Sequence, residues 1–325
     1  MLRIPGLLAC VALAIVAEVL GARVPLVGAP VFAIVLGVAI AAVRPLAPFW
    51  TAGTAFAAKT VLQWSIVLLG AQLSLGEIAS GGRAALPVML GTFVLVLALA
   101  YVAGRALALD RDLRRLLAVG TAICGGSAIA ALASVVDVDR SDVAYALATI
   151  FFFNVVAVLT FPALGHALGL SQSAFGLWAG TAINDTSSVV AAAFAYGHAA
   201  GNSAVVVKLT RTLLIVPVVG FYALRRIAER REGDKPVPWM AVVPWFILWF
   251  LAAAALDTAG AIPPAWHEPI QRVALFTIVV ALAGVGLSSD LERIKAAGLR
   301  PLALGAILWI AIAMGSLAIA HSTGI

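Results

Sequence analysis

Two short stretches of the chain decide how it is interpreted. Gly120-Thr-Ala-Ile-Cys-Gly-Gly-Ser-Ala-Ile-Ala-Ala131 and Gly180-Thr-Ala-Ile-Asn-Asp-Thr-Ser-Ser-Val-Val-Ala191 match one another at an offset of 60 residues. In each copy an apolar half-helix meets small or polar residues and then resumes, and such residues are poor in helix interiors. Each half is about 10 residues, or roughly 15 Å, which is half of a hydrocarbon core. The pattern predicts two broken helices.

The composition excludes a soluble protein. Of the 325 residues, 63% are hydrophobic and 11% charged, and the mean hydropathy is +1.09. A soluble domain is about half apolar and about a quarter charged. A soluble enzyme, a nucleic-acid binder and a disordered chain are therefore excluded. Cys10 and Cys124 both lie in apolar runs and indicate neither a disulfide framework nor a metal site. We expect an all-α polytopic membrane protein.

Apolar runs long enough to cross a bilayer recur along the whole chain. They lie near 5–22, 26–43, 57–75, 85–107, 113–136, 142–165, 174–197, 203–224, 238–258, 270–288 and 300–320. If every run crosses, the protein has eleven transmembrane helices; if 113–136 and 174–197 are re-entrant, it has nine. We interpret the first run as a retained span, because Glu18 and Arg23 stand where a signal-peptide cleavage site would be.

One polar segment divides the chain. We expect a single transmembrane transporter domain, 1–325, with an N-terminal part, 1–224, a cytoplasmic linker, 225–238, and a C-terminal part, 239–325. With the N-terminus inside, most of the 21 Lys and Arg residues, Lys59 included, fall on the inner side. The exceptions outside the runs are Arg23, Arg83, Arg140 and Arg272. The basic pI of about 9.8 thus reflects how the protein is oriented in the membrane. No nucleic-acid partner is expected.

A second, weaker repeat has an offset of 214 residues. Its matched pairs are Gly70/Gly284, Leu73/Leu287, Ser74/Ser288, Pro87/Pro301, Leu90/Leu304 and Gly91/Gly305. The third run leads outward and the tenth leads inward, so the repeat is inverted, as in many secondary transporters.

The broken helices predict an anion site near the bilayer midplane. A half-helix that restarts after a break presents free N–H groups and the positive end of its dipole. We therefore expect the substrate to bind at two groups of residues, Gly125, Gly126 and Ser127 in the first copy and Thr186, Ser187 and Ser188 in the second. The alternative is that these small residues mark tight helix packing.

Three charged residues lie within the runs near these breaks. Asp185 is central, where an ionisable group is costly and therefore a functional candidate. Lys208 and Arg211 are one turn apart on one helix face and could neutralise Asp185, attract an anion, or do both. The alternative for Lys208 is snorkelling to the interface. Asn184 and Asp185 are the expected coupling-ion residues.

Enzyme motifs are absent from the sequence. It contains no His-Glu-x-x-His, no Gly-x-Ser-x-Gly and no phosphate-binding Gly-Lys-Ser/Thr loop. We therefore expect no catalytic residue and no cofactor. Transport would be driven by gradients, with possible coupling to H⁺ or Na⁺, rather than by ATP.

Three motifs together resemble the YeiH-type sulfate exporter family of bacterial inner-membrane proteins. They are Cys124-Gly-Gly-Ser-Ala-Ile-Ala-Ala131, the segment from Phe175 to Ala192, and Lys208-Leu-Thr-Arg211. The resemblance implies kinship with the bile-acid/sodium symporter superfamily, with inverted repeats and two discontinuous helices at the substrate site. That family usually has His before the acid of the second motif and Gln three residues after it. Asn184 and Ser188 stand there instead, so coupling would fall to Asp185 or be absent.

We expect a secondary transporter of a small anion, sulfate or a related sulfur oxyanion, working by alternating access; export is implied by the resemblance alone. A sodium-coupled organic-anion symporter is the alternative, and an intramembrane enzyme or a structural scaffold is more remote. The expected location is the bacterial inner membrane, multi-pass, with a cytoplasmic N-terminus. The expected partners are the anionic substrate, the lipid bilayer and a second copy in a homodimer.

Overall fold

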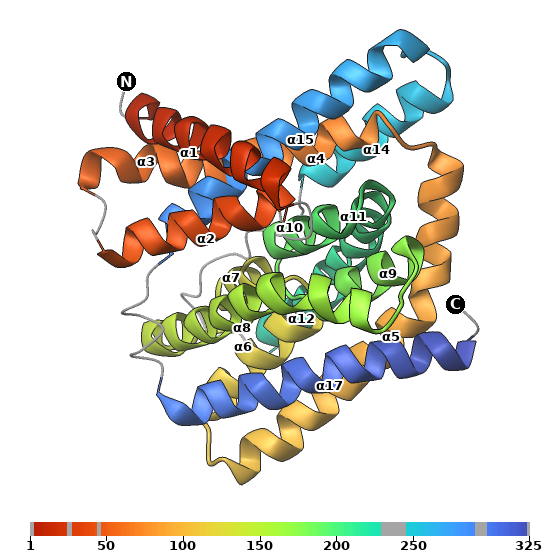
Figure 1. Cartoon of the computed structure of the whole chain (residues 1–325). Helices are drawn as coiled ribbons and strands as arrows, with labels where there is room; N and C mark the ends of the chain where they lie inside the picture. Colours follow the sequence, from red (N-terminus) through yellow and green to blue (C-terminus); the bar gives the residue numbers. More distant parts are fainter. Residues whose placement is uncertain (1–2, 25–27, 44–46, 229–244, 290–297, 324–325) are drawn as a thin grey trace.

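All the regular structure in the described residues is helical, as expected (Figure 1). The computed structural model describes residues 3–24, 28–43, 47–228, 245–289 and 298–323. Its helices are α1 (Ile4–Arg23), α2 (Gly28–Val43), α3 (Pro48–Phe56), the π-helix η1 (Ala57–Val61), α4 (Leu62–Gly70), α5 (Leu75–Ala106), α6 (Arg111–Ala122), α7 (Gly126–Ala133), α8 (Arg140–Ala167), α9 (Gln172–Ala182), α10 (Thr186–Tyr196), α11 (His198–Thr212), α12 (Ile215–Ala228), α14 (Trp245–Thr258), α15 (Pro264–Leu287) and α17 (Leu299–Thr323).

Seven helical stretches in the described residues are long and apolar enough to cross a membrane. They are α1, the continuous stretch from α3 to α4, α5, α8, the stretch formed by α11 and α12, α15 and α17. The apolar helices α2 and α14 are shorter. The predicted linker 225–238 begins within α12, and its residues after Ala228 lie outside the described part of the chain.

Several runs begin earlier than the hydropathy pattern predicts. The third, predicted from residue 57, begins at Pro48, because proline favours the first helical turn. Lys59, counted above on the inner side, therefore lies midway along a helical stretch long and apolar enough to cross a membrane. The fourth begins at Leu75 rather than 85, where Ser74 and Glu77 form a capping box. In α5, Glu77, Ser80 and Arg83 lower the hydropathy of the first turns and hide the true start of the run.

Two pairs of long helices pack antiparallel. In the first, Ser65 Oγ of α4 donates to Thr277 Oγ1 of α15 (3.0 Å), and Gln72 Nε2 donates to the carbonyl of His267 (2.8 Å). In the second, the second half of α5 lies beside α17, while the start of α5 points away from it (Figure 1). Gly91 faces Ile319, and Gly104 faces Leu304.

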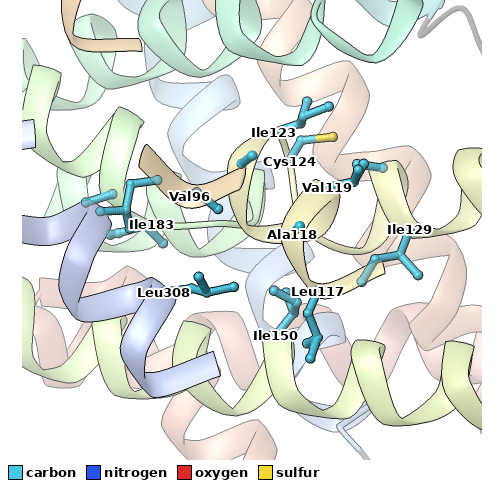
Figure 2. Close-up of a cluster of buried hydrophobic side chains, with 14 of the residues drawn as sticks. Val96, Leu117, Ala118, Val119, Ile123, Cys124, Ile129, Ile150, Ile183 and Leu308 are labelled. Atoms are coloured by element: carbon cyan, nitrogen blue, oxygen red, sulfur yellow. The ribbon is translucent and has the colours of Figure 1, made fainter. Parts of the chain in front are cut away.

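The pair α6–α7, with the break Ile123–Gly125 between its helices, folds back on itself; we call it hairpin 1. A Cβ at Gly120 would lie 2.8 Å from Cδ1 of Ile129, nine residues further along. A straight helix would place these residues about 13 Å apart. Figure 2 shows Ile129 of α7 in the same buried cluster as Leu117 of α6.

The pair α9–α10, with the break Ile183–Asp185, also folds back; we call it hairpin 2. At its open end the Tyr196 hydroxyl donates to the carbonyl of Leu170 (2.5 Å), and the rings of Tyr196 and Phe175 stack with centroids 3.8 Å apart. The end of α10 therefore lies beside the start of α9, and the break forms the tip.

Each hairpin is followed by a helix that runs parallel to the hairpin's first helix. After hairpin 2, Gln172 Oε1 accepts from the Ala199 N–H at the start of α11 (3.0 Å). Further along, Gly180 of α9 packs on Val207 of α11. Close packing at glycine is what lets two backbones approach this tightly.

The long helix α8 carries the chain from one hairpin to the other. It begins shortly after hairpin 1 ends, and its last turn meets the open end of hairpin 2, where His166 stacks on Tyr196 with ring centroids 4.2 Å apart. The middle of α8 packs against hairpin 1, since a Cβ at Gly125 would lie 3.2 Å from Ile150. The open ends thus lie at opposite ends of α8, and the tips lie between them.

Buried apolar residues form two large clusters. One joins the hairpins to α5, α8, α12 and α17, and Figure 2 shows part of it. The other joins α1, α2, α4, α14 and α15. Residues of α10 and α11 belong to both clusters, so these two helices connect the two halves of the molecule.

Candidate functional site

The tips of the two hairpins touch, and we call the region where they meet the crossing site. A Cβ at Gly125 would lie 3.5 Å from the Asn184 carbonyl carbon and 3.5 Å from the Asp185 Cα, which is ordinary van der Waals distance. Sequence repetition predicted two breaks; the fold brings them into contact.

Hairpin 1 turns at a glycine that the backbone requires. Gly125 has φ +69° and ψ −127°, a conformation that residues with a Cβ rarely adopt. It begins α7, and no side chain caps that helix. Within the described residues, the N–H groups of Gly126 and Ser127 in the first turn of α7 therefore have no capping side chain, and Ser127 is exposed.

Hairpin 2 turns at an acid that caps the next helix. Asp185, with an ordinary φ of −94°, accepts hydrogen bonds from the N–H (3.0 Å) and the hydroxyl of Ser187. Its own N–H donates to Asn154 Oδ1 of α8 (3.2 Å). Asp185 and Thr186 are half-buried, whereas Ser187 and Ser188 are buried. The predicted substrate-binding residues of this copy of the repeat thus differ in solvent exposure.

Lys208 forms hydrogen bonds with both hairpins next to their tips. Its Nζ donates to the carbonyl of Ile123 in hairpin 1 (3.1 Å) and to that of Ile183 in hairpin 2 (2.8 Å). The side chain is 0% exposed, and α11 begins ten residues before it. Snorkelling to the interface is therefore excluded.

Arg211 binds the end of α6 alone. Its Nε donates to the Ala122 carbonyl (2.7 Å) and one Nη to that of Thr121 (2.8 Å), and the side chain is 0% exposed. Both cations therefore sit at the carboxyl ends of broken helices, where the dipole is negative. Within the described residues neither forms an ion pair with Asp185.

Five buried polar atoms in and around the crossing site have no hydrogen-bond partner among the described residues. They are Thr121 Oγ1, Asn154 Nδ2, Thr181 Oγ1, Asn184 Oδ1 and Arg211 Nη1. Most buried polar groups in proteins are paired with protein or ordered water. A water or a polar ligand in this region would satisfy them.

Sequence reasoning missed part of this set. Asn154 of α8 was not among the predicted site residues, and it accepts a hydrogen bond from the backbone of the Asp185 break. Thr121 and Thr181 occupy matching positions in the repeat, which is the signal that could have identified them. No cluster of His, Cys, Asp and Glu that could hold a metal ion occurs within the described residues.

The comparisons with known proteins agree on one family of membrane proteins. The family model named Conserved hypothetical protein 698 matches residues 5–305. A UPF0324 membrane protein of Streptococcus pneumoniae serotype 4 is 41% identical, with 98% of this chain and 97% of the relative aligned. One from Streptococcus mutans is 39% identical over 99% of this chain and 98% of the relative. A third, SAG1125 of Streptococcus agalactiae, is 37% identical over 97% and 96%.

Proposed function

The chain belongs to the Conserved hypothetical protein 698 family, and we propose that it is a secondary transporter of a small anion, sulfate or a related sulfur oxyanion. In this proposal it exports the anion across the bacterial inner membrane by alternating access, and it is not an enzyme. The observation that carries it is the uncapped start of α7 at the tip contact, with two buried cations behind it.

The anion would bind between the tips. The free N–H groups at Gly126 and Ser127 and the hydroxyls of Ser127 and Thr186 supply donors, which is how helix N-termini bind oxyanions. Lys208 has three donors and uses two on carbonyls; Arg211 keeps Nη1 without a partner in the described residues. With Asp185, the three charges leave one net positive charge to attract an anion.

We further propose that both hairpins are re-entrant, entering from opposite faces, and that the protein has nine spans. The tip-to-tip geometry and the opposite open ends support this, and so does the count of seven long and two shorter apolar helices outside the hairpins. The packing of matched helices supports the inverted repeat of offset 214. That offset pairs α4 with α15 and α5 with α17, and each of these pairs packs antiparallel, as two inverted copies would.

Transport would follow from this arrangement. The unit of hairpins with α8 and α11 would move against the helices of the second apolar cluster, exposing the crossing site to each side in turn. Asp185 would bind the coupling proton or hold the tip in shape. With the N-terminus inside, hairpin 1 opens to the cytoplasm and hairpin 2 to the outside.

A flux assay tests the substrate. Purified protein in proteoliposomes loaded with sulfate should exchange radiolabelled sulfate, with sulfite and thiosulfate as competitors, above protein-free vesicles. Arg83→Gln is the matched control, because among the described residues exposed Arg83 bonds only the Ala79 carbonyl of its own helix. Failure of all three anions to exchange would refute the anion proposal. Asp185→Asn with unchanged flux and pH dependence would refute the coupling role.

Cysteine labelling tests the topology. In a background with Cys10 and Cys124 replaced, exposed positions 137 and 173 become cysteine. Re-entrant hairpins predict that Asp137→Cys is labelled by a membrane-impermeant maleimide from the inside and Ser173→Cys from the outside. Full spans predict the reverse, which would overturn the nine-span arrangement.

A further inference from the structure

The breaks after α6 and α9 leave helix-end carbonyl groups on buried residues. The last carbonyls of a helix have no partner within it, and at bilayer depth each must be satisfied by protein or a bound ligand. Four such carbonyls face side chains at the crossing site, those of Thr121, Ala122, Ile123 and Ile183. These are the groups that coordinate coupling cations in carriers with broken helices.

In this protein two side chains already occupy those carbonyls. The ammonium of Lys208 lies 3.1 and 2.8 Å from one carbonyl oxygen of each hairpin, as a cation shared between two broken helices would. The guanidinium of Arg211 holds the other two carbonyls at 2.7 and 2.8 Å. Both side chains are fully buried, so the positions are filled by covalently attached cations.

Neighbouring oxygens remain unpaired but do not make a sodium site. Thr121 Oγ1 and Asn184 Oδ1 lack partners in the described residues, and each belongs to a residue at, or directly after, a carbonyl that a cation holds. Lys208 and Arg211, hydrogen-bonded to carbonyls of the same or the preceding residue, would repel a third cation there, and at low dielectric this repulsion is strong. Water or an anion's hydrogen-bond donors suit these atoms better.

We propose that Lys208 and Arg211 replace the coupling sodium ions, so that this protein binds and moves its anion independently of Na⁺. The part of this inference that concerns flux rests on the proposed function. The part that concerns Na⁺ binding does not. Lys208 holds the two tips together and Arg211 holds the end of α6, and the anion is balanced by these side chains instead of by co-transported metal ions. A sodium-coupled cycle is then excluded for this chain.

The first test uses the wild-type protein. Its melting temperature in detergent is compared in NaCl and in choline chloride of equal ionic strength, and sulfate exchange is measured with the same two salts. The expected result is the same melting temperature and the same flux in both. A melting temperature or flux that rises with Na⁺ would overturn the inference. Absence of flux in both salts would count against the anion proposal only, because the melting comparison decides sodium binding by itself.

The second test empties the cation position. Lys208→Gln removes the charge between the Ile123 and Ile183 carbonyls, so Na⁺ should now raise the melting temperature, an effect absent from the wild type and from Arg83→Gln. A Lys208→Gln protein that folds and ignores Na⁺ would contradict the replacement. If the variant cannot be purified, the wild-type comparison still decides.

Discussion

Hairpins 1 and 2 begin with the same Gly-Thr-Ala-Ile sequence and make opposite use of the residue that starts their second helix. In hairpin 1 that residue is Gly125, at φ +69°, and α7 begins without a side-chain cap. In hairpin 2 the matching residue is Asp185, at φ −94°, and its carboxylate caps α10. An uncapped helix N-terminus has free N–H donors for a ligand, whereas in a capped one some of these donors are already hydrogen-bonded to the capping side chain.

In the proposed function this difference gives the two tips separate roles. Hairpin 1 would hold the anion, because it carries no negative charge and the start of α7 is uncapped. Hairpin 2 would hold the coupling proton, because it carries Asp185. Lys208 joins the two, since it alone among the described side chains bonds a carbonyl of each break.

The largest effect is expected where the hairpins are joined. Lys208→Met should leave the carbonyls of Ile123 and Ile183 unpaired, at about 1–3 kcal/mol each. Arg211→Met should affect hairpin 1 alone. We expect the free energy of unfolding to fall most in Lys208→Met, measured by thermal and denaturant unfolding in detergent. Arg83→Gln should be unchanged, and a Lys208→Met protein as stable as this control would break the proposed link.

The next effect tests why hairpin 1 is uncapped. Gly125→Asn and Gly125→Asp place nearly identical side chains in a conformation that costs about 1–3 kcal/mol for a residue other than glycine. Both should lose similar stability, but only Asp adds a carboxylate where the anion would bind. We expect sulfate affinity to be lower in Gly125→Asp than in Gly125→Asn, measured by thermal shift against sulfate concentration. Equal affinities would place the anion elsewhere.

The smallest effect tests the cap of hairpin 2. Asp185→Ala should cost about 1 kcal/mol through loss of the cap to Ser187, while Asp185→Asn, itself a good cap, should retain most of it. Unfolding measurements separate the two. The flux of both variants should lose its pH dependence if Asp185 carries the proton, and a pH profile retained in both would assign coupling to another group.

Much of the architecture could be predicted from the sequence because the signals are local. Composition over 20-residue windows identifies membrane helices, and Gly125-Gly126 and Asn184-Asp185 mark helix breaks through short-range backbone preferences. Run starts were less predictable: α3 begins at Pro48 and α5 follows its cap Ser74, both earlier than the apolar runs indicated. Lys59, counted on the inner side, therefore lies midway along a long helical stretch.

By itself the sequence determined the class of protein, the two breaks and the three charged residues near them. Only the tertiary structure decided that each broken helix folds back and that the tips meet. It also decided where Lys208 and Arg211 point, because their partners lie 25 to 90 residues away in the chain. Charge attraction suggested Asp185 as that partner. The stronger requirement was the need of buried helix-end carbonyls for donors, and it depends on which ends the fold brings together.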